Sequence, residues 1–332
     1  MIVKKLLAAV ITIGAVLILI PGAMLFAQFT YDTTEMQQDL EDVTQIFSNL
    51  FGKNVGSIAM IGDPIGYAII PHFEIGVAGG AVFVPIKNIN EGTDMVYDLG
   101  GLTYTPLPSV SAHVKVNIRG FELGAKVAGI PPVELRSETY RGEIQSMVIG
   151  GKLRYGIIDK HKGVFQYGLS AGGFYEYTNG SLSVTMLDTF AVYEDVDDNG
   201  TDEYIADLTA TGDFDSEWRG HTFGGEVQGN MKILFLNLFA GGRLSTSWGK
   251  ATTSINADTS AELTPDGVAS GVTIDNPTEP ISVTTDAEPD GIAFYGFGGL
   301  EFKIFPLVLG ARGGYNFRNQ VITLDLGARL QF

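Results

Sequence analysis

The sequence predicts an all-β protein, a transmembrane antiparallel β-barrel of about 12 strands within a range of roughly 10 to 14. Apolar and polar residues alternate with a period of two in segment after segment from residue 57 to residue 332. The chain contains 43 glycines without the triplet period of collagen. Beyond the N-terminal region no apolar run is long enough for a membrane-spanning helix, so any further crossing must use strands.

The last predicted strand, residues 321–332, shows the alternation most clearly. Its apolar face carries Ile322, Leu324, Leu326, Ala328, Leu330 and Phe332. Asp325 and Arg329 lie on the opposite, polar face. A soluble protein gains little from a large apolar terminal residue, because chain ends usually fray.

This ending resembles the closing strand of outer-membrane β-barrels of double-membraned bacteria, in which a terminal Phe is part of the insertion signal. The resemblance implies that Phe332 and Leu330 form such a signal. It also implies two partners, the outer-membrane lipid and the outer-membrane assembly machinery. We therefore expect the protein in the cell outer membrane.

The N-terminus has the pattern of a secretory signal. Lys4 and Lys5 precede an uncharged apolar run over residues 6–20, and small residues follow up to Ala27. We predict a cleaved signal peptide over residues 1–27, with Ala23 as the alternative cleavage point and a retained membrane anchor as the competing interpretation. The protein would reach the periplasm first.

A short amphipathic helix is predicted within residues 28–53, ahead of a barrel over residues 54–332. Asp32 and Glu35 provide a helix start signal, and Gly52 a stop. The apolar positions recur at helical spacing at Met36, Leu40, Val43, Phe47 and Leu50. The helix could plug the barrel or pack at its periplasmic mouth. As a plug it would resemble the N-terminal hatch of the FadL family of fatty-acid channels.

The polar faces of the predicted strands carry charges of both signs. In a barrel these side chains line the lumen, where they border a wet channel or pair to fill a closed interior. The predicted lumen-lining residues are Lys115, Arg119, Lys152, Arg154, Glu176, Glu226, Glu301, Arg312, Asp325 and Arg329. Phe235 and Phe239 would also face inward.

The connections are predicted to be short at one end and long at the other, as in outer-membrane barrels. Short turns are expected at residues 178–180, near residues 229–230 and at residues 305–306. Residues 193–218 and 251–291 lack Lys and Arg and are expected to be long, acidic extracellular loops. Tyr193, Trp218 and Trp248 stand where these loops join their strands, which predicts an interfacial aromatic girdle.

One segment has the spacing of a calcium-binding loop. Its oxygen-bearing residues recur at every second position, and Gly200 stands where such loops turn sharply. The predicted ligands are Asp195, Asp197, Asn199, Thr201 and Glu203. The segment departs from the EF-hand because its twelfth position is Ala206, where a bidentate Glu is needed. An acidic, solvated loop is the alternative, and no other cofactor is predicted.

Composition and missing motifs exclude several functions. The formal net charge of −17, without any basic cluster, argues against nucleic acid as a partner. The absence of cysteine excludes disulfides and lipoprotein anchoring. The four histidines form no metal-binding doublet and no nucleophile elbow is present, so we do not expect an enzyme.

The sequence is compatible with two functions. The first is a passive channel or uptake pore for small solutes, hydrophobic ones included, with the solute unknown. The second is a closed-lumen structural or surface-binding barrel, similar to an adhesin, with acidic extracellular loops. A soluble β-sandwich remains the alternative fold, in which the apolar faces would be buried in a core.

Overall fold

A computed structural model describes residues 40–41, 44–45, 48–49, 72–85, 104–136, 140–194, 203–263, 281–289 and 291–332. Within these ranges the chain forms eleven strands. They are β1 (His72–Pro85), β2 (Tyr104–Ile118), β3 (Phe121–Arg136), β4 (Tyr140–Lys162), β5 (Phe165–Glu194), β6 (Glu203–Ile233), β7 (Leu236–Leu263), β8 (Ile281–Ala287), β9 (Ile292–Ile304), β10 (Leu307–Asn316) and β11 (Ile322–Gln331).

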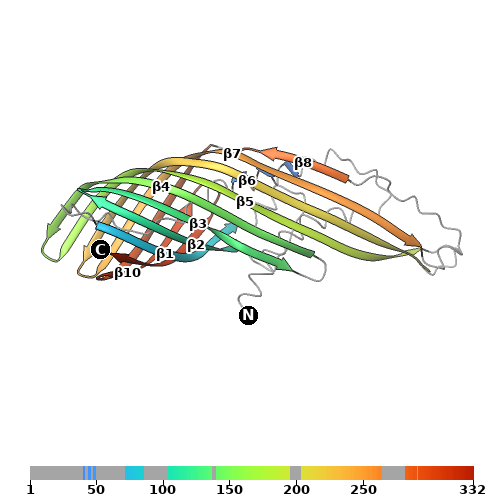
Figure 1. The fold of residues 1–332 in the computed structure, drawn as a ribbon, viewed down its shortest axis with the longest axis horizontal. Helices are drawn as coiled ribbons and strands as arrows, with labels where there is room; N and C mark the ends of the chain where they lie inside the picture. Colours follow the sequence, from blue (N-terminus) through green and yellow to red (C-terminus); the bar gives the residue numbers. More distant parts are fainter. Residues whose placement is uncertain are drawn as a thin grey trace.

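The strands close into an antiparallel barrel (Figure 1). Each strand from β1 to β7 pairs with the next, β7 pairs with β9, and the ring continues through β10 and β11 back to β1. In the described part of the chain the wall therefore holds ten strands, with β8 outside the ring. The barrel prediction is confirmed, and these ten strands plus β8 lie within the predicted range of 10 to 14, below its central value of 12.

Strand β8 continues the line of β9. Both strands pair antiparallel with β7 in one unbroken register, since Ala251 pairs with Ala287 and Thr246 with Ile292. The interruption falls between Ala287 and Ile292. Glu288 and Pro289 lie in it, and proline has no N–H to donate to a ladder. The eighth strand of the wall thus belongs to one long line that is interrupted between β8 and β9, and its β9 part closes the ring.

The barrel closes along the seam between β1 and β11. Their pairing extends from Glu74 opposite Gln331 to Phe83 opposite Ile322. Beyond it, the backbones of Phe73 and Phe332 exchange two hydrogen bonds, with N–O distances of 3.1 and 2.9 Å. The predicted closing strand therefore closes the wall against the first strand.

Strands β5, β6 and β7 have 30, 31 and 28 residues, far more than the roughly 9 to 11 that cross a membrane. The turn predicted at residues 178–180 lies inside β5, and the one predicted near residues 229–230 lies inside β6. Pairing on both flanks keeps the chain extended there: Asn179 is paired with Met147 of β4 and Arg219 of β6. Only the turn at residues 305–306 is where we predicted it.

The two ends of the barrel differ. At the turn end, tight turns join β2 to β3, β4 to β5, β6 to β7 and β9 to β10, and the C-terminus lies there (Figure 1). At the opposite end β5, β6 and β7 project furthest, with β4 paired along β5 and β8 along β7, and we call this region of β4 to β8 the extension. Most of the two segments predicted to be acidic loops is strand in the extension, because the alternation of residue types continues through their Thr, Ser and Asp residues.

Candidate functional site

The outer wall of the barrel is an apolar belt. Its outward-facing residues are large, apolar and about half exposed, as with Val77, Leu153, Val227 and Leu326. The belt runs along β7 from Leu236 to Trp248 and is followed by outward Lys250. These roughly 12 residues, tilted as barrel strands are, rise on the order of 30 Å, close to the apolar band of outer-membrane barrels.

Aromatic residues mark the edge of this belt nearer the extension, and of the three girdle residues that we predicted only Trp248 is among them. Tyr177, His221 and Trp248 stand opposite one another on β5, β6 and β7, and the rings of His221 and Trp248 stack with centroids 5.3 Å apart. Trp218 is only 2% exposed and belongs to the inward set, so its predicted place in the girdle is wrong. Tyr193 lies near the far tip of β5, beside a register shift, well past the belt.

The inward face of the same strands is charged and buried. Glu74, at the start of β1, forms ion pairs with Lys115 at 2.7 Å and Arg329 at 2.9 Å, and His113 contacts its carboxylate at 3.1 Å. Arg329 also forms a bidentate pair with Glu301, at 2.6 and 2.9 Å. Three neighbouring strands, β1, β2 and β11, and the more distant β9 are therefore tied together across the interior.

A second group of charges crosses the middle of the barrel. Arg154 on β4 pairs with Glu122 on β3 at 2.7 Å and donates to Gln228 on β6 at 2.9 Å. Glu226 accepts from Lys152 at 2.8 Å and from Arg243 at 2.6 Å. These side chains are at most 5% exposed.

Glu176 extends this second group of charges, because it pairs with Lys126 at 2.7 Å and lies 3.6 Å from Arg243. We call the buried charged residues of both groups the ion-pair lattice. Its members are Glu74, Lys115, Glu122, Lys126, Lys152, Arg154, Glu176, Glu226, Arg243, Glu301 and Arg329.

Aromatic rings fill the interior beside the lattice. Phe239, Tyr295 and Phe297 form a buried cluster, and the guanidinium of Arg312 lies 4.3 Å from the Phe297 ring centroid. The Tyr295 hydroxyl bonds to Thr323 on β11 at 2.5 Å. Nothing in the sequence distinguishes these inward aromatics from outward ones except their position in the alternation.

The predicted lumen residues mostly lie where the alternation placed them. Lys115, Lys152, Arg154, Glu176, Glu226, Glu301, Arg312, Asp325 and Arg329 are buried inside the wall. Arg119 is exposed, because it occupies the β2–β3 turn with a φ of 50°, and this prediction is wrong. Phe235 is also exposed, in the β6–β7 turn, whereas Phe239 faces inward as expected. Phe332 and Leu330 face outward in the belt.

Part of the predicted N-terminal helix lies within the described residues. Leu40, Thr44 and Ser48 are helical and buried. The Thr44 hydroxyl bonds to inward-facing Thr285 of β8 at 2.7 Å. Asn319, in the β10–β11 turn, donates to the Asn49 carbonyl at 2.9 Å. The described helical residues thus contact the extension end, opposite the turn end.

Within the part of the chain that the structure describes, no helix has the length and apolarity to cross a membrane.

The predicted calcium ligands lie outside the described residues, apart from Glu203 at the start of β6. Among the described residues no group of three or more His, Asp or Glu is arranged to hold a metal ion. Calcium binding by residues 195–203 stays a prediction, as does the absence of catalytic activity.

The outer face of the extension is polar and rich in carboxylates. Asp213, Asp215 and Glu217 follow one another along the exposed face of β6. Hydroxyl groups and lysine pair with such carboxylates, since Thr185 donates to Asp213 at 2.7 Å and Lys250 lies 2.9 Å from Asp286. This surface, unlike the belt below it, is suited to water.

An apolar exterior around a charged interior is the arrangement of a β-barrel in an outer membrane. Soluble sandwiches have the reverse arrangement. The chain is therefore an outer-membrane β-barrel protein.

Solved bacterial barrels resemble this chain in fold. The translocator domain of the autotransporter NalP from Neisseria meningitidis is 10% identical, with 92% of this chain and 100% of that chain covered and a TM-score of 0.30. The outer membrane protease OmpT from Escherichia coli is 10% identical, with 83% and 99% covered and a TM-score of 0.36. A Pseudomonas aeruginosa FadL homologue is 10% identical, with 86% and 97% covered and a TM-score of 0.25. Scores this low support no inference about activity.

No curated protein matches the sequence. A family model described as Lsa36-like, however, matches residues 63–332. This match takes in every strand of the barrel, and the chain belongs to the Lsa36-like family.

Proposed function

We propose that this protein is a closed-lumen anchor in the outer membrane that displays its extension beyond the membrane as a binding surface. The ion-pair lattice carries the proposal. It crosses the barrel from β1 to β9 at the height of the apolar belt, with its side chains at most 5% exposed. Charges that bordered a water-filled channel would be exposed to that water.

The width of the barrel supports a closed lumen. Eight strands leave an interior that side chains just fill, and ten strands leave little more. Here that additional space holds long side chains, Lys152, Arg154 and Arg243, and the rings of Phe239 and Phe297. Removing one partner of a buried ion pair typically costs about 3 to 5 kcal/mol, so the loss of a single lattice residue should destabilise the filled interior.

The N-terminal helix supplies a second closure in this proposal. Thr44 and Asn49 are held by β8 and by the β10–β11 turn, at the end opposite the C-terminus. These contacts support the plug-like placement over the periplasmic one. The helix would then lie beneath the extension and cover its inner face.

The binding surface would be the outer face of the extension. Asp213, Asp215 and Glu217 are exposed side by side on β6, flanked by the hydroxyls of β5 and β7. Such a surface favours partners that present cationic groups and hydrogen-bond donors. With the signal peptide over residues 1–27 and the C-terminus on the periplasmic side, the extension would point away from the cell.

Planar-bilayer recording tests the closed lumen. The refolded protein is expected to give no discrete current steps. Deletion of residues 29–53 should leave it silent, because the lattice stays in place across the belt. The triple variant Arg154→Ala, Glu226→Ala, Arg243→Ala removes the centre of the lattice and should produce steps. Heat-modifiable gel mobility controls for folding of each variant.

Discrete steps from the unaltered protein would overturn the proposal in favour of the passive channel. Steps that appear only after residues 29–53 are deleted would assign the closure to the helix and not to the lattice. The same recording therefore separates the channel, the plugged barrel and the filled barrel.

A further inference from the structure

One register row of outward-facing residues crosses seven strands of the wall. Leu326 pairs with Gly79, Gly79 with Val110, and Val110 with Gly129. The row continues from Gly129 to Met147, from Met147 to Asn179, and from Asn179 to Arg219. It begins on apolar residues of β11 and ends on polar residues of β6. Six inter-strand steps of about 4.8 Å give the row a length of roughly 29 Å.

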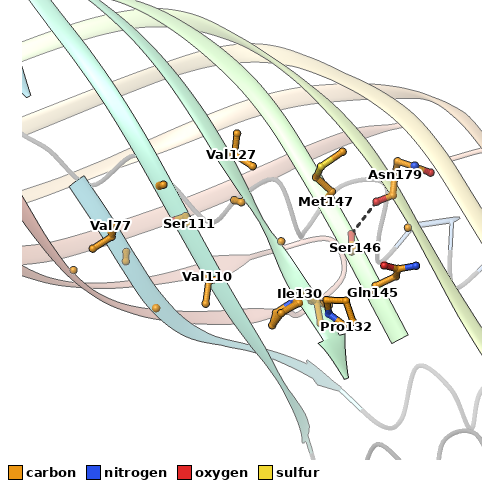
Figure 2. Close-up of a pocket in the computed structure, with 18 of the residues that line it drawn as sticks. Val77, Val110, Ser111, Val127, Ile130, Pro132, Gln145, Ser146, Met147 and Asn179 are labelled. Carbon is orange, nitrogen blue, oxygen red and sulfur yellow. Dashed lines mark hydrogen bonds between the residues drawn. The ribbon is translucent and has the colours of Figure 1, made fainter. Parts of the chain in front are cut away.

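The wall is split in the middle of this row, between β2 and β3. Among the described residues the pairing of β2 with β3 ends at Val110 and Gly129, although both strands continue. Prolines follow on both sides of this split, at Pro106 and Pro108 of β2 and at positions 131 and 132 of β3. Because proline has no N–H for a ladder, the two edges cannot pair further. Figure 2 shows β2 and β3 diverging past Val110 and Ile130.

A groove of about 1170 Å³ follows the row and the split (Figure 2). It is larger than most pockets for small molecules, which span roughly 300–1,000 Å³. The floor of the groove is hollow at Gly79, because this residue has no side chain between those of Leu326 and Val110. Val77, Val127 and Met147 form apolar walls. The polar part contains Gln145, Asn179, Arg219 and Glu217, and the Glu217 carboxylate lies 4.0 Å from the Arg219 guanidinium at the exposed rim.

The groove crosses the edge of the apolar belt. Asn179 is the first outward residue beyond Tyr177 on β5, and Arg219 the first beyond His221 on β6, so both lie just past the aromatic row. Leu326 and Val77 lie within the belt. The apolar part of the groove is therefore at the depth of hydrocarbon chains, and the polar part is at the depth of lipid headgroups.

We infer that this groove binds the acyl chain of a membrane lipid, with the lipid headgroup at Asn179 and Arg219. Apolar surface at hydrocarbon depth selects an alkyl chain, and the amide and guanidinium groups at the rim donate hydrogen bonds to the oxygens of a headgroup. The half-thickness of a bilayer core is about 15 Å, so a chain of that length fits within the row. The site is on the outer wall and is independent of whether the lumen is closed.

Site-directed fluorescence tests the inference, because the protein has no cysteine and single cysteines can be labelled cleanly. A bimane probe is attached to Met147→Cys in the groove or to Leu244→Cys, an outward belt residue on β7 that does not line it. The full-length, refolded protein in detergent micelles is titrated with a single-chain phosphatidylglycerol that carries bromine on its acyl chain. Quenching at Met147→Cys should saturate at a lipid fraction about tenfold below that needed at Leu244→Cys, which corresponds to roughly 1.4 kcal/mol.

Filling the groove provides the matched control. A Cβ at Gly79 would meet only the Ser109 carbonyl, at 3.8 Å, and a Cβ at Gly151 only the Gly124 carbonyl, also at 3.8 Å. Both glycines face outward, but only Gly79 lines the groove. Gly79→Leu should abolish the tenfold preference, and Gly151→Leu should preserve it. Ala112→Leu, also in the groove, takes the place of Gly79→Leu if that variant does not fold.

Equal quenching at the two labelled positions would overturn the inference. So would a preference that survives both Gly79→Leu and Ala112→Leu. Neither result depends on the conductance of the protein, so failure of this inference and failure of the closed lumen are separate outcomes.

Discussion

The glutamates of the ion-pair lattice each contact at least one cation inside the barrel. Glu74 is reached from β2 and β11, and Glu226 from β4 and β7. Because an isolated buried charge is very costly, such contacts explain how a charged interior is compatible with folding. The alternation of residue types predicts that these side chains face inward. It cannot predict that Glu226 meets Lys152 and Arg243, because the first pair joins strands that are distant in the chain and the second depends on the register of the β6–β7 hairpin.

On the extension, the carboxylate of Asp286 has a pKa below its ordinary value. The pKa of Asp286 is lowered because its carboxylate accepts hydrogen bonds from Lys250 and Thr252, which favour its charged form. A folded-state pKa below the unfolded value of roughly 3.9 means that the pair stabilises the extension above that pH. The contribution is lost as the pH falls through the folded pKa.

We therefore expect Lys250→Met to raise the pKa of Asp286 toward its ordinary value. Carboxyl ¹³C shifts of Asp286, followed through an acid titration, measure this change. Lys160→Met, on β4 near the turn end, is the control and should leave the Asp286 titration unchanged. An identical Asp286 curve in the Lys250 variant would contradict the assignment.

At the scale of elements, the length of β5, β6 and β7 determines the shape of the molecule. An Asn-Gly pair is a strong hairpin signal, yet Asn179 and Gly180 continue a strand. Local turn chemistry is overridden here by pairing on both flanks, with β4 and β6. The sequence therefore indicated too many wall strands, since one long strand was read as two. The break between β8 and β9 also cannot be located from alternation alone.

Gly180 is required by close packing and not by a turn. A Cβ at this position would meet the Trp218 ring and, at 2.6 Å, the Gln145 carbonyl. Gly180→Ala should lower the free energy of unfolding by about 1 to 3 kcal/mol, the usual cost of overpacking. Urea unfolding of the refolded protein measures it. On the same strand, a Cβ at Gly173 would meet only the Gly224 carbonyl, at 3.6 Å. Gly173→Ala should therefore leave the free energy of unfolding unchanged or raise it slightly. Equal stabilities for the two variants would refute this role.

At the scale of the whole molecule, the alternation, the glycine content and the closing strand were sufficient to predict a membrane barrel. The arrangement that separates an open barrel from a filled one was not predictable. It depends on which of the inward side chains of β1 to β11 meet across the interior, and on rings such as Phe239 that face inward in a charged lumen. The lipid groove was also hidden, because it arises from a register row and from a split between two strands.

Phe332 extends the seam that closes the barrel between β1 and β11. Phe332 exchanges two backbone hydrogen bonds with Phe73, and its side chain is 61% exposed toward the belt. Phe332→Ala should reduce the assembled fraction several-fold while leaving secretion to the periplasm intact. Heat-modifiable mobility of membrane fractions measures assembly. Phe121→Ala, an equally outward aromatic at the turn end, is the control and should assemble normally. Normal assembly of the Phe332 variant would contradict an insertion signal.

The unbroken course of β5, β6 and β7 from the turn end to the tip of the extension has a mechanical consequence. A tether that pulls on the tip loads these strands along their length. Their ladder hydrogen bonds lie across that direction, so many must yield together in shear before the sheet gives way. Force applied outside the cell would therefore be carried directly into the wall of the barrel, without a hinge at the membrane surface.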